Sequence, residues 1–255
     1  MRTGIKPLIP DLLADALRSA RALVVLTGAG VSAESGIPTF RDAMNGLWSK
    51  CDPHELATPE AFARDPETVT RWYDRRREKC AAAKPNAAHL ALARLELHLA
   101  VQKRVFTLLT QNVDRLHQAA GSRNVVELHG TLWIWRCIRC GAEREERAVP
   151  FREYPPRCAC GGPRRPAVVW FGEMLPEDAI QEAYGALETC DVFFSIGTSA
   201  VVEPAAGFTH SARHHGARTV EINRDPTPIS NVVDWSLLGK AGEIMPELVR
   251  MTFGV

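Results

Sequence analysis

The sequence lacks the segments that place a chain in a membrane or on a secretory route. Its 255 residues contain no run of about 18 apolar residues, which excludes a membrane-spanning helix. The N-terminal segment has no apolar core and no small-residue cleavage site, and its acidic residues argue against a transit peptide. We therefore expect a cytoplasmic protein without a membrane partner.

The chain also has little net charge and no disulfide framework. A formal net charge of +1 gives no global reason to bind nucleic acid. The seven cysteines are an odd number, and four of them cluster. We expect the scattered Cys51, Cys80 and Cys190 to be ordinary buried or half-buried side chains. The hydrophobic content of 45% is typical of a globular protein with a substantial core.

Short apolar runs alternate with helical patterns along most of the chain. Near-continuous apolar strands separated by helices predict an α/β fold with a Rossmann-like, doubly wound parallel sheet. The expected strands are 22–27, 104–110, 124–128, 167–171, 191–197 and 218–223, and the expected helices are 86–100, 176–190 and 204–216.

Two segments interrupt this alternation. Residues 42–85 are polar and helical, and residues 131–166 hold the clustered cysteines with many arginines and prolines. We expect both to form a small domain, a zinc ribbon plus a helical insertion, beside a Rossmann-like domain of residues 1–41, 86–130 and 167–255.

The stretch VVLTGAGVSAESGIPTFR, residues 24–41, runs from a strand into a glycine-rich turn. Gly28, Gly30 and Ala33 fit the pattern G-x-G-x-x-[G/A], which allows a pyrophosphate close to the backbone. A turn without any ligand is the alternative. The acid expected about 20 residues later is missing. Motifs at later strand ends, GTS (197–199) and EINRD (221–225), instead suggest that several strand ends share nucleotide recognition.

Polar residues follow two other predicted strands. Gln111, Asn112 and Asp114 follow one, and His129 in ELHGTL follows the next. Histidine titrates near neutrality, so His129 is a candidate general acid or base. The remaining histidines that we considered are read as structural: His89, His98, His117, His214 and His215.

The clustered cysteines have the spacing of a zinc ribbon. The pattern is C-x2-C, then 17 residues, then C-x-C, formed by Cys137, Cys140, Cys158 and Cys160. Four thiolates form a closed tetrahedral site without a position for water, so the expected Zn²⁺ is structural. Residues 136–165 hold eight arginines and four glutamates, which keeps a nucleic-acid contact open as a minor alternative.

The stretch TRWYDRRREKC, residues 70–80, predicts a helix with one unusual arginine. Helical spacing places Arg76 on the apolar face with Trp72 and Tyr73, while Arg75 and Arg77 point away from its centre. We expect Arg75 and Arg77 to be solvated and Arg76 to point inward.

The motifs GAGVSAESGIPTFR, TQNVDRLH, ELHG, AVVWFGE, GTS and EIN, with the cysteine module, resemble the sirtuins, which are NAD-dependent protein lysine deacylases. The resemblance covers about residues 20 to 245. It implies that NAD is consumed, that the acyl-lysine oxygen displaces nicotinamide, and that lysine and O-acyl-ADP-ribose are released. The short termini lead us to expect a prokaryotic member.

The resemblance also implies site residues. His129 would be the general base, assisted by Asn112, and substrate peptide would add as a strand along Val169, Phe171, Gly172 and Glu173. The implied NAD-binding residues are Gly28, Ala29, Gly30, Ser32, Phe40, Arg41, Gln111, Asn112, Asp114, Gly197, Thr198, Ser199, Asn223, Arg224, Asp225 and Ala241.

Tyr73 and Arg76 match the pair of the sirtuin branch that removes succinyl, malonyl and glutaryl groups, and Ala57 matches a small residue of that branch. We therefore expect desuccinylation or demalonylation with weaker deacetylation. A guanidinium can hold an acyl carboxylate with two hydrogen bonds. A merely structural contact between the two residues is the alternative.

Two departures from the family pattern stand out. The second cysteine pair is C-x-C, which bacterial members of the branch share, and Arg224 replaces a common aliphatic residue.

Two other functions stay open: mono-ADP-ribosylation or NAD hydrolysis by the same site, and a non-enzymatic zinc-ribbon adaptor for nucleic acid. His129, the cysteines and the substrate strand together favour deacylation.

Overall fold

A computed structural model describes residues 9–39 and 53–255 of the chain. The predicted NAD-binding residues Phe40 and Arg41, and the scattered Cys51, lie outside these described residues. No helix in the described ranges is both long and apolar enough to span a bilayer.

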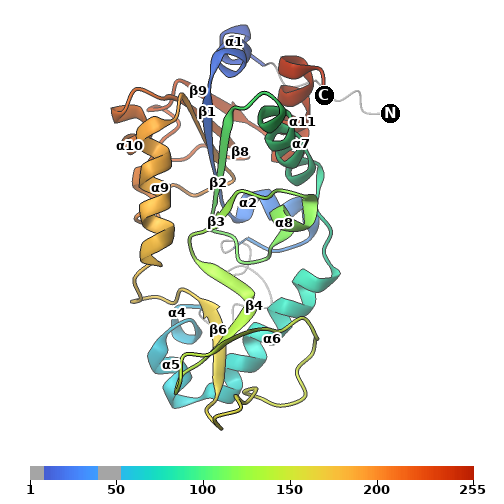
Figure 1. Cartoon of the computed structure of the whole chain (residues 1–255), viewed down its shortest axis with the longest axis vertical. Coiled ribbons are helices and arrows are strands. Elements are labelled where there is room, and N and C mark those ends of the chain that lie inside the picture. Colours follow the sequence, from blue (N-terminus) through green and yellow to red (C-terminus); the bar gives the residue numbers. More distant parts are fainter. Residues whose placement is uncertain (1–8, 40–52) are drawn as a thin grey trace.

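The larger part of the molecule is a six-stranded parallel sheet, which confirms the predicted α/β fold (Figure 1). Its strand order is β3-β2-β1-β7-β8-β9. The strands are β1 (Ala22–Thr27), β2 (Val105–Thr110), β3 (Val125–Glu127), β7 (Val192–Ile196), β8 (Arg218–Asn223) and β9 (Trp235–Leu238).

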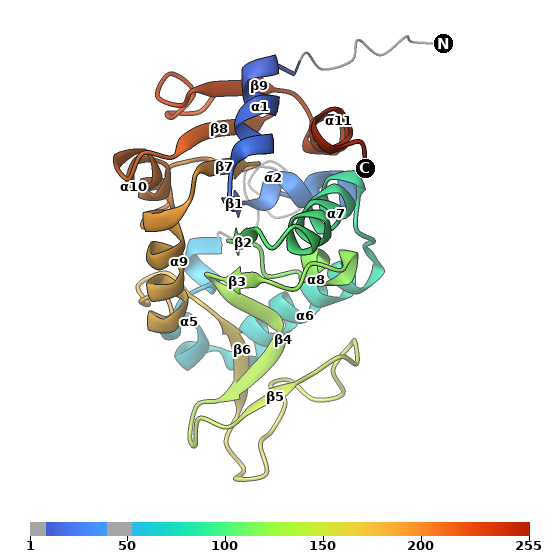
Figure 2. The ribbon, with the colours of Figure 1, turned by 45° about the horizontal axis from the view of Figure 1, so that its top comes forward.

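Helices cover both faces of this sheet, which explains why its central strands are apolar without alternation (Figure 2). Leu23 and Val25 of β1 face a core with the helices α1, α7 and α11, whereas Val24 and Leu26 face a core with α9 and α10. The helices are α1 (Asp11–Ser19), α7 (Ala87–Val101), α9 (Glu177–Thr189), α10 (Phe208–His214) and α11 (Ala241–Phe253), with shorter α2 (Ala29–Ser32), η1 (Ala33–Ser35), α8 (Leu116–Ala120) and η3 (Ala205–Gly207).

The strand order reverses its direction between β1 and β7. From β1 the chain adds β2 and β3 on one side, and β7, β8 and β9 on the other. In α/β sheets such a reversal, at the carboxyl ends of the strands, is where ligands bind.

A smaller antiparallel sheet lies at the opposite end of the molecule from α1 and packs against the helical insertion (Figure 1). Apolar side chains of α5 and α6 share one core with β4, β6 and the segment after β6, for example Phe62 and Tyr73 with Trp135 and Trp170. The elements are β4 (Gly130–Cys137), β5 (Glu143–Glu145), β6 (Arg164–Val168), α4 (Pro53–Leu56), α5 (Pro59–Arg64) and α6 (Pro66–Ala82).

The prediction that residues 167–171 form a strand of the large sheet is wrong. The strand there, β6, is Arg164–Val168, and it pairs with β4 in the small sheet. An apolar run is compatible with any buried strand, and the pairing partner is not encoded in the run itself. Strands β4, β5 and the short edge strand β9 were not predicted from the sequence.

Gly130 lies where the two sheets meet. It pairs with Val168 and has a φ of +68°. A Cβ atom at this position would lie 2.0 Å from the carbonyl oxygen of Ala167, so only glycine allows β4 and β6 to approach here. This close crossing brings His129, the preceding residue, next to the segment that follows β6.

The prediction that Arg77 of helix α6 is solvated is wrong. Arg75 is exposed as expected and Arg76 is half-buried, but Arg77 is buried completely. Its guanidinium donates to Asp74 Oδ1 at 2.7 Å and to the carbonyl oxygens of Glu146 and Ala148. Helix α6 is thus covered on a second face by the segment after β5. The periodicity of apolar residues does not predict the burial of a helix face whose buried side chains are charged and paired.

Candidate functional site

The glycine-rich loop lies at the reversal between β1 and β7. Gly28 N–H donates to Ile196 O and Gly30 N–H to Gly197 O. A Cβ on Gly28 would lie 2.8 Å from Gly197 O, and one on Gly30 would lie 2.7 Å from Gly197 Cα. The glycines therefore allow the loops after β1 and β7 to pack against each other at the carboxyl edge of the sheet.

Buried polar residues lie beneath this loop. Asn112 Nδ2 donates to Gly28 O at 3.0 Å, and Ser32 Oγ donates to Asp114 Oδ2 at 2.7 Å. Asp114 Oδ1 also accepts from Leu116 N–H. Burial raises the pKa of Asp114, and these two hydrogen bonds oppose that rise. The network joins the loop after β1 to the loop after β2, so both keep a fixed shape.

His129 has a defined tautomer. Its Nδ1 lies 3.2 Å from Gln111 O, and Gln111 N–H donates to Thr27 O. Because a carbonyl oxygen only accepts, Nδ1 carries the proton and Nε2 keeps its lone pair in the neutral ring. Burial lowers the pKa of His129, partly opposed by the bond to Gln111, so the neutral form persists at neutral pH. The side chain is suited to accept a proton at Nε2.

The loops after β7 and β8 complete this edge of the sheet. Asn223 Nδ2 donates to Thr198 O, and Glu34 Oε1 accepts from Gly242 N–H, which brings the start of α11 and Ala241 to the same edge. Ser199, Arg224 and Asp225 are exposed, and the last two form a surface ion pair. The described NAD-binding candidates thus follow β1, β2, β7 and β8 or begin α11.

Tyr73 and Arg76 lie on the side of α6 that faces the other candidates. Tyr73 is 2% exposed, and its hydroxyl accepts a hydrogen bond from Trp170 Nε1 at 2.8 Å. The Arg76 guanidinium lies 4.9 Å from the ring centre of Trp72 and 5.5 Å from that of Tyr73. Burial raises the pKa of both Tyr73 and Asp114, and the nearby charge of Arg76 opposes that rise.

The segment after β6 links these groups to His129. Val169 N–H donates to His129 O at 3.0 Å, and Phe171 N–H donates to the carbonyl oxygen of the buried Ala57 at 2.9 Å. Gly172 follows with a φ of +84°. Glu173 receives two hydrogen bonds from Arg165, at 2.6 and 2.8 Å. Glu173 therefore holds the segment in place through Arg165.

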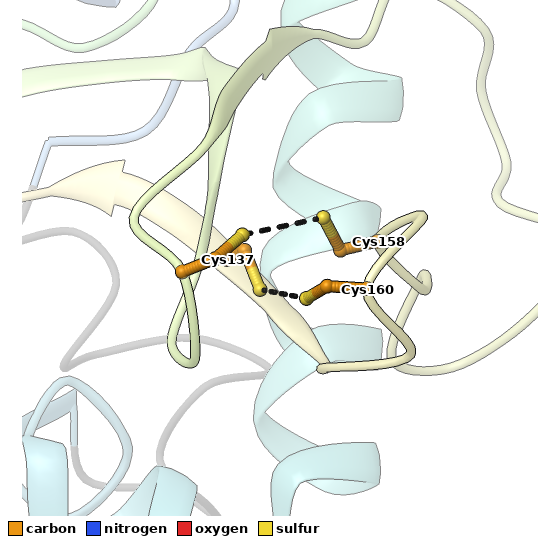
Figure 3. Close-up of side chains that lie close together, drawn as sticks. Cys137, Cys158 and Cys160 are labelled. Carbon is orange, nitrogen blue, oxygen red and sulfur yellow. Dashed lines mark hydrogen bonds between the residues drawn. The ribbon is translucent and has the colours of Figure 1, made fainter.

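The four clustered cysteines form a preorganised metal-ligand set. Their sulfur atoms lie within 4.8 Å of one another, with Cys137 and Cys160 at 3.5 Å and Cys140 and Cys158 at 3.7 Å (Figure 3). Tetrahedral Zn²⁺ with Zn–S bonds of about 2.3 Å requires sulfur separations of about 3.8 Å. Backbone hydrogen bonds lower the pKa of Cys137 and of Cys158, which favours their thiolate forms. At Cys140 a backbone hydrogen bond from Ala142 is outweighed by the neighbouring thiols, and the pKa is raised. The set fits a structural zinc ion.

Known proteins resemble the chain over almost its whole length. Residues 28–204 match the model of the Sir2 family. NAD-dependent protein deacylase 1 of Pseudomonas aeruginosa is 51% identical over 246 residues, 93% of this chain and 96% of that protein. The chain belongs to the Sir2 family.

Two solved Sir2 structures support this membership. A Sir2 homologue in complex with NAD has a TM-score of 0.90 and 48% identity, covering 97% of this chain and 95% of that one. A Sir2 protein with a deacetylated p53 peptide and 3′-O-acetyl ADP ribose has a TM-score of 0.84 and 33% identity, covering 96% and 98%. The Sir2 fold is therefore common to all three chains.

The arginines of the cysteine module in this Sir2 chain are mostly engaged within the protein. Arg164 is buried and donates to Trp135 O, Ala142 O and Cys158 Sγ. The others with a partner inside the described residues are Arg139, Arg144, Arg147, Arg157 and Arg165. Six of the eight arginines thus have a partner within the described residues, which disfavours the nucleic-acid alternative.

Two histidines that the sequence led us to expect as structural residues, His89 and His117, are buried in this Sir2 chain and contact residues of the glycine-rich segment and of β1. The ring centres of His89 and His117 lie 4.7 Å apart with the planes tilted by 55°. Their Nε2 atoms lie 3.5 Å from Ser32 Oγ and 3.0 Å from Thr27 Oγ1, respectively. Both rings are buried, so both stay neutral. His89 follows Asn86 by three residues, and the two form a capping box at the start of α7. This spacing is the sequence signal for the structural role of His89.

Proposed function

We propose that this Sir2-family chain is an NAD-dependent protein lysine deacylase that prefers acyl groups ending in a carboxylate, such as succinyl and malonyl, over acetyl. Relatives that are about half identical over nearly the whole chain are NAD-dependent protein deacylases, which supports the general reaction. The complexes of family members with NAD and with a deacetylated peptide support NAD as co-substrate and acyl-lysine peptides as substrates.

The acyl preference rests on one observation: Arg76 is half-buried beside Tyr73, and it pairs with no carboxylate in residues 9–39 and 53–255. A guanidinium withdrawn from water without an acidic partner is costly unless a ligand supplies one. Burial raises the pKa of Tyr73 to about 12, so its phenol remains a hydrogen-bond donor at neutral pH. An acyl carboxylate would receive hydrogen bonds from both groups.

His129 serves as the general base in this proposal. NAD, bound at the edge between β1 and β7, supplies an activated ribose with nicotinamide as leaving group. The unprotonated Nε2 of His129 accepts a proton from a ribose hydroxyl. Asn112, Asp114 and Gln111 give the ribose and nicotinamide sites their shape through the buried network beneath Gly28.

The smaller part of the molecule has a structural role in this proposal. The described part of the helical insertion, residues 53–85, forms one small domain with residues 131–166, in which four thiolates hold a zinc ion with no position for water. The substrate peptide lies as an added strand along residues 169–173, which makes recognition depend mainly on backbone contacts.

The test compares matched succinyl-lysine and acetyl-lysine peptides with NAD in Arg76→Met. A hydrogen-bonded charge contributes about 1.5–3 kcal/mol, so the succinyl-to-acetyl ratio of kcat/KM should fall by about 10- to 150-fold. Arg75→Met is the matched control, since Arg75 is exposed on the same helix. Equal losses on both peptides, or no loss, would exclude the carboxylate role of Arg76.

A further inference from the structure

Trp170 connects the proposed substrate segment to the helix that carries Tyr73 and Arg76. The residue is 2% exposed, and its indole stacks with the Tyr73 ring at a centroid distance of 6.2 Å and an interplanar angle of 29°. Its Nε1 lies 2.8 Å from the Tyr73 hydroxyl oxygen. Within residues 9–39 and 53–255, the Tyr73 hydroxyl makes no other hydrogen bond.

The direction of this hydrogen bond follows from chemistry. An indole N–H donates and cannot accept, so the Tyr73 oxygen is the acceptor. The phenolic proton is therefore not used in this bond and remains available to another acceptor. A phenylalanine at position 170 would preserve most of the packing but would leave the Tyr73 hydroxyl free to rotate or to bond differently.

Trp170 itself is held on two sides. The guanidinium carbon of Arg165 lies 3.3 Å from the centre of the indole ring, and Phe62 packs at 5.5 Å. The backbone N–H of Trp170 donates to Glu173 Oε2 at 2.9 Å, and Glu173 is in turn bound by Arg165. Because ring and backbone are both fixed, the indole N–H has little freedom to leave Tyr73.

We propose that Trp170 is a positioning residue for acyl specificity, whose indole N–H orients the Tyr73 hydroxyl so that the phenolic proton is presented to the acyl carboxylate. The proposal rests on the proposed function, because it assigns a further residue to the same acyl site. Trp170 acts through Tyr73 and does not itself contact the carboxylate. An acetyl group offers no carboxylate, so its removal depends less on this orientation.

The experiment measures kcat/KM for matched succinyl-lysine and acetyl-lysine peptides at saturating NAD, with the full-length zinc-loaded protein. Trp170→Phe should lower the succinyl-to-acetyl ratio by about 2- to 12-fold, the effect of one net hydrogen bond, mainly through the KM of the succinyl peptide. Trp135→Phe is the matched control, since it removes another buried indole bond, to Leu132 O, in the same core.

A double-mutant cycle with Tyr73→Phe separates positioning from packing. If Trp170 acts through the hydroxyl, Trp170→Phe should not change the ratio further once Tyr73 is phenylalanine. An equal loss on both peptides, or the same fall of the ratio in the Tyr73→Phe background, would overturn the proposal. Should Trp170→Phe fold poorly, the sulfur isostere of tryptophan, which replaces the N–H by sulfur, gives the same comparison.

The outcomes for Trp170 and Arg76 are distinguishable. If Arg76→Met leaves the ratio unchanged, the acyl-carboxylate function itself is wrong. If Arg76→Met lowers the ratio and Trp170→Phe does not, the carboxylate site stands and the positioning role of Trp170 is refuted.

Discussion

The substitution Arg77→Met should destabilise the protein far more than the equivalent change at its neighbour Arg75. The side chains of Arg77 and Asp74 are 0% and 2% exposed and form a 2.7 Å ion pair. Arg77 also donates to two carbonyl oxygens of the segment after β5. A methionine would fill a similar volume but would leave the Asp74 charge without a cation and both carbonyls without this donor.

The magnitude follows from the remaining partners of Asp74. Removing one member of a buried ion pair costs about 3–5 kcal/mol. Asp74 Oδ2 would still accept from Phe151 N–H and from the Tyr154 hydroxyl, each at 2.8 Å, so we expect the lower end, about 3 kcal/mol. For a chain of this size each kcal/mol lowers the melting temperature by about 2–4 °C, which predicts a fall of about 6–12 °C.

The assay is thermal and urea unfolding of the zinc-loaded protein, followed by circular dichroism. Arg75→Met is the control, because Arg75 is exposed and a surface change of this kind stays within about 0.5 kcal/mol. If Arg77→Met proves no more destabilising than Arg75→Met, the buried pair between α6 and the segment after β5 does not contribute as we argue.

Three further predictions concern titration and metal binding. His129→Ala should abolish turnover of both acyl peptides. Because burial lowers the pKa of His129, the kcat/KM of the wild-type protein should fall only below about pH 6.5. A loss of kcat/KM that begins at a higher pH would contradict this. Burial lowers the pKa of His89 to about 4 and of His117 to about 3, so below about pH 6.5 the unfolded chain binds protons that the folded chain does not. The free energy of unfolding in urea should therefore decrease as the pH falls from about 6.5 towards 4, less steeply in His117→Gln, and an identical slope would be inconsistent with the buried neutral pair. Elemental analysis should find one zinc ion per chain, and chelation should unfold the small sheet; a folded, fully active protein without metal would disprove the structural role.

The large sheet and its functional edge could be predicted because the relevant signals are local or follow from parallel pairing. Apolar runs in the sequence predicted the strands β1, β2, β7 and β8. The carboxyl ends of parallel strands lie at one edge of a sheet, whichever face the connecting helices cover. The positions of Asn112 and His129 at that edge followed from this rule. The zinc ligands were predictable because their spacing alone defines the set.

The remaining features depend on which surfaces meet in three dimensions. The apolar run at 167–171 suited a parallel strand, but its pairing with β4 is decided by the crossing at Gly130. The same holds for Gly28 and Gly30. Their sequence pattern predicted a phosphate site, but it did not predict that the loop containing Gly197 fills the space that a Cβ atom at either position would need.

Arg76 and Arg77 are adjacent on α6, and burial alone would select the wrong one as functional. Arg77 is the more buried, yet its guanidinium is bonded to a carboxylate and two carbonyl oxygens of the protein, so a ligand could bind there only by breaking these bonds. Arg76 is less buried and has no such partner in the described ranges, while Tyr73 beside it retains an unused proton. A buried guanidinium without a protein carboxylate is a better sign of an anionic ligand than a fully buried and paired one.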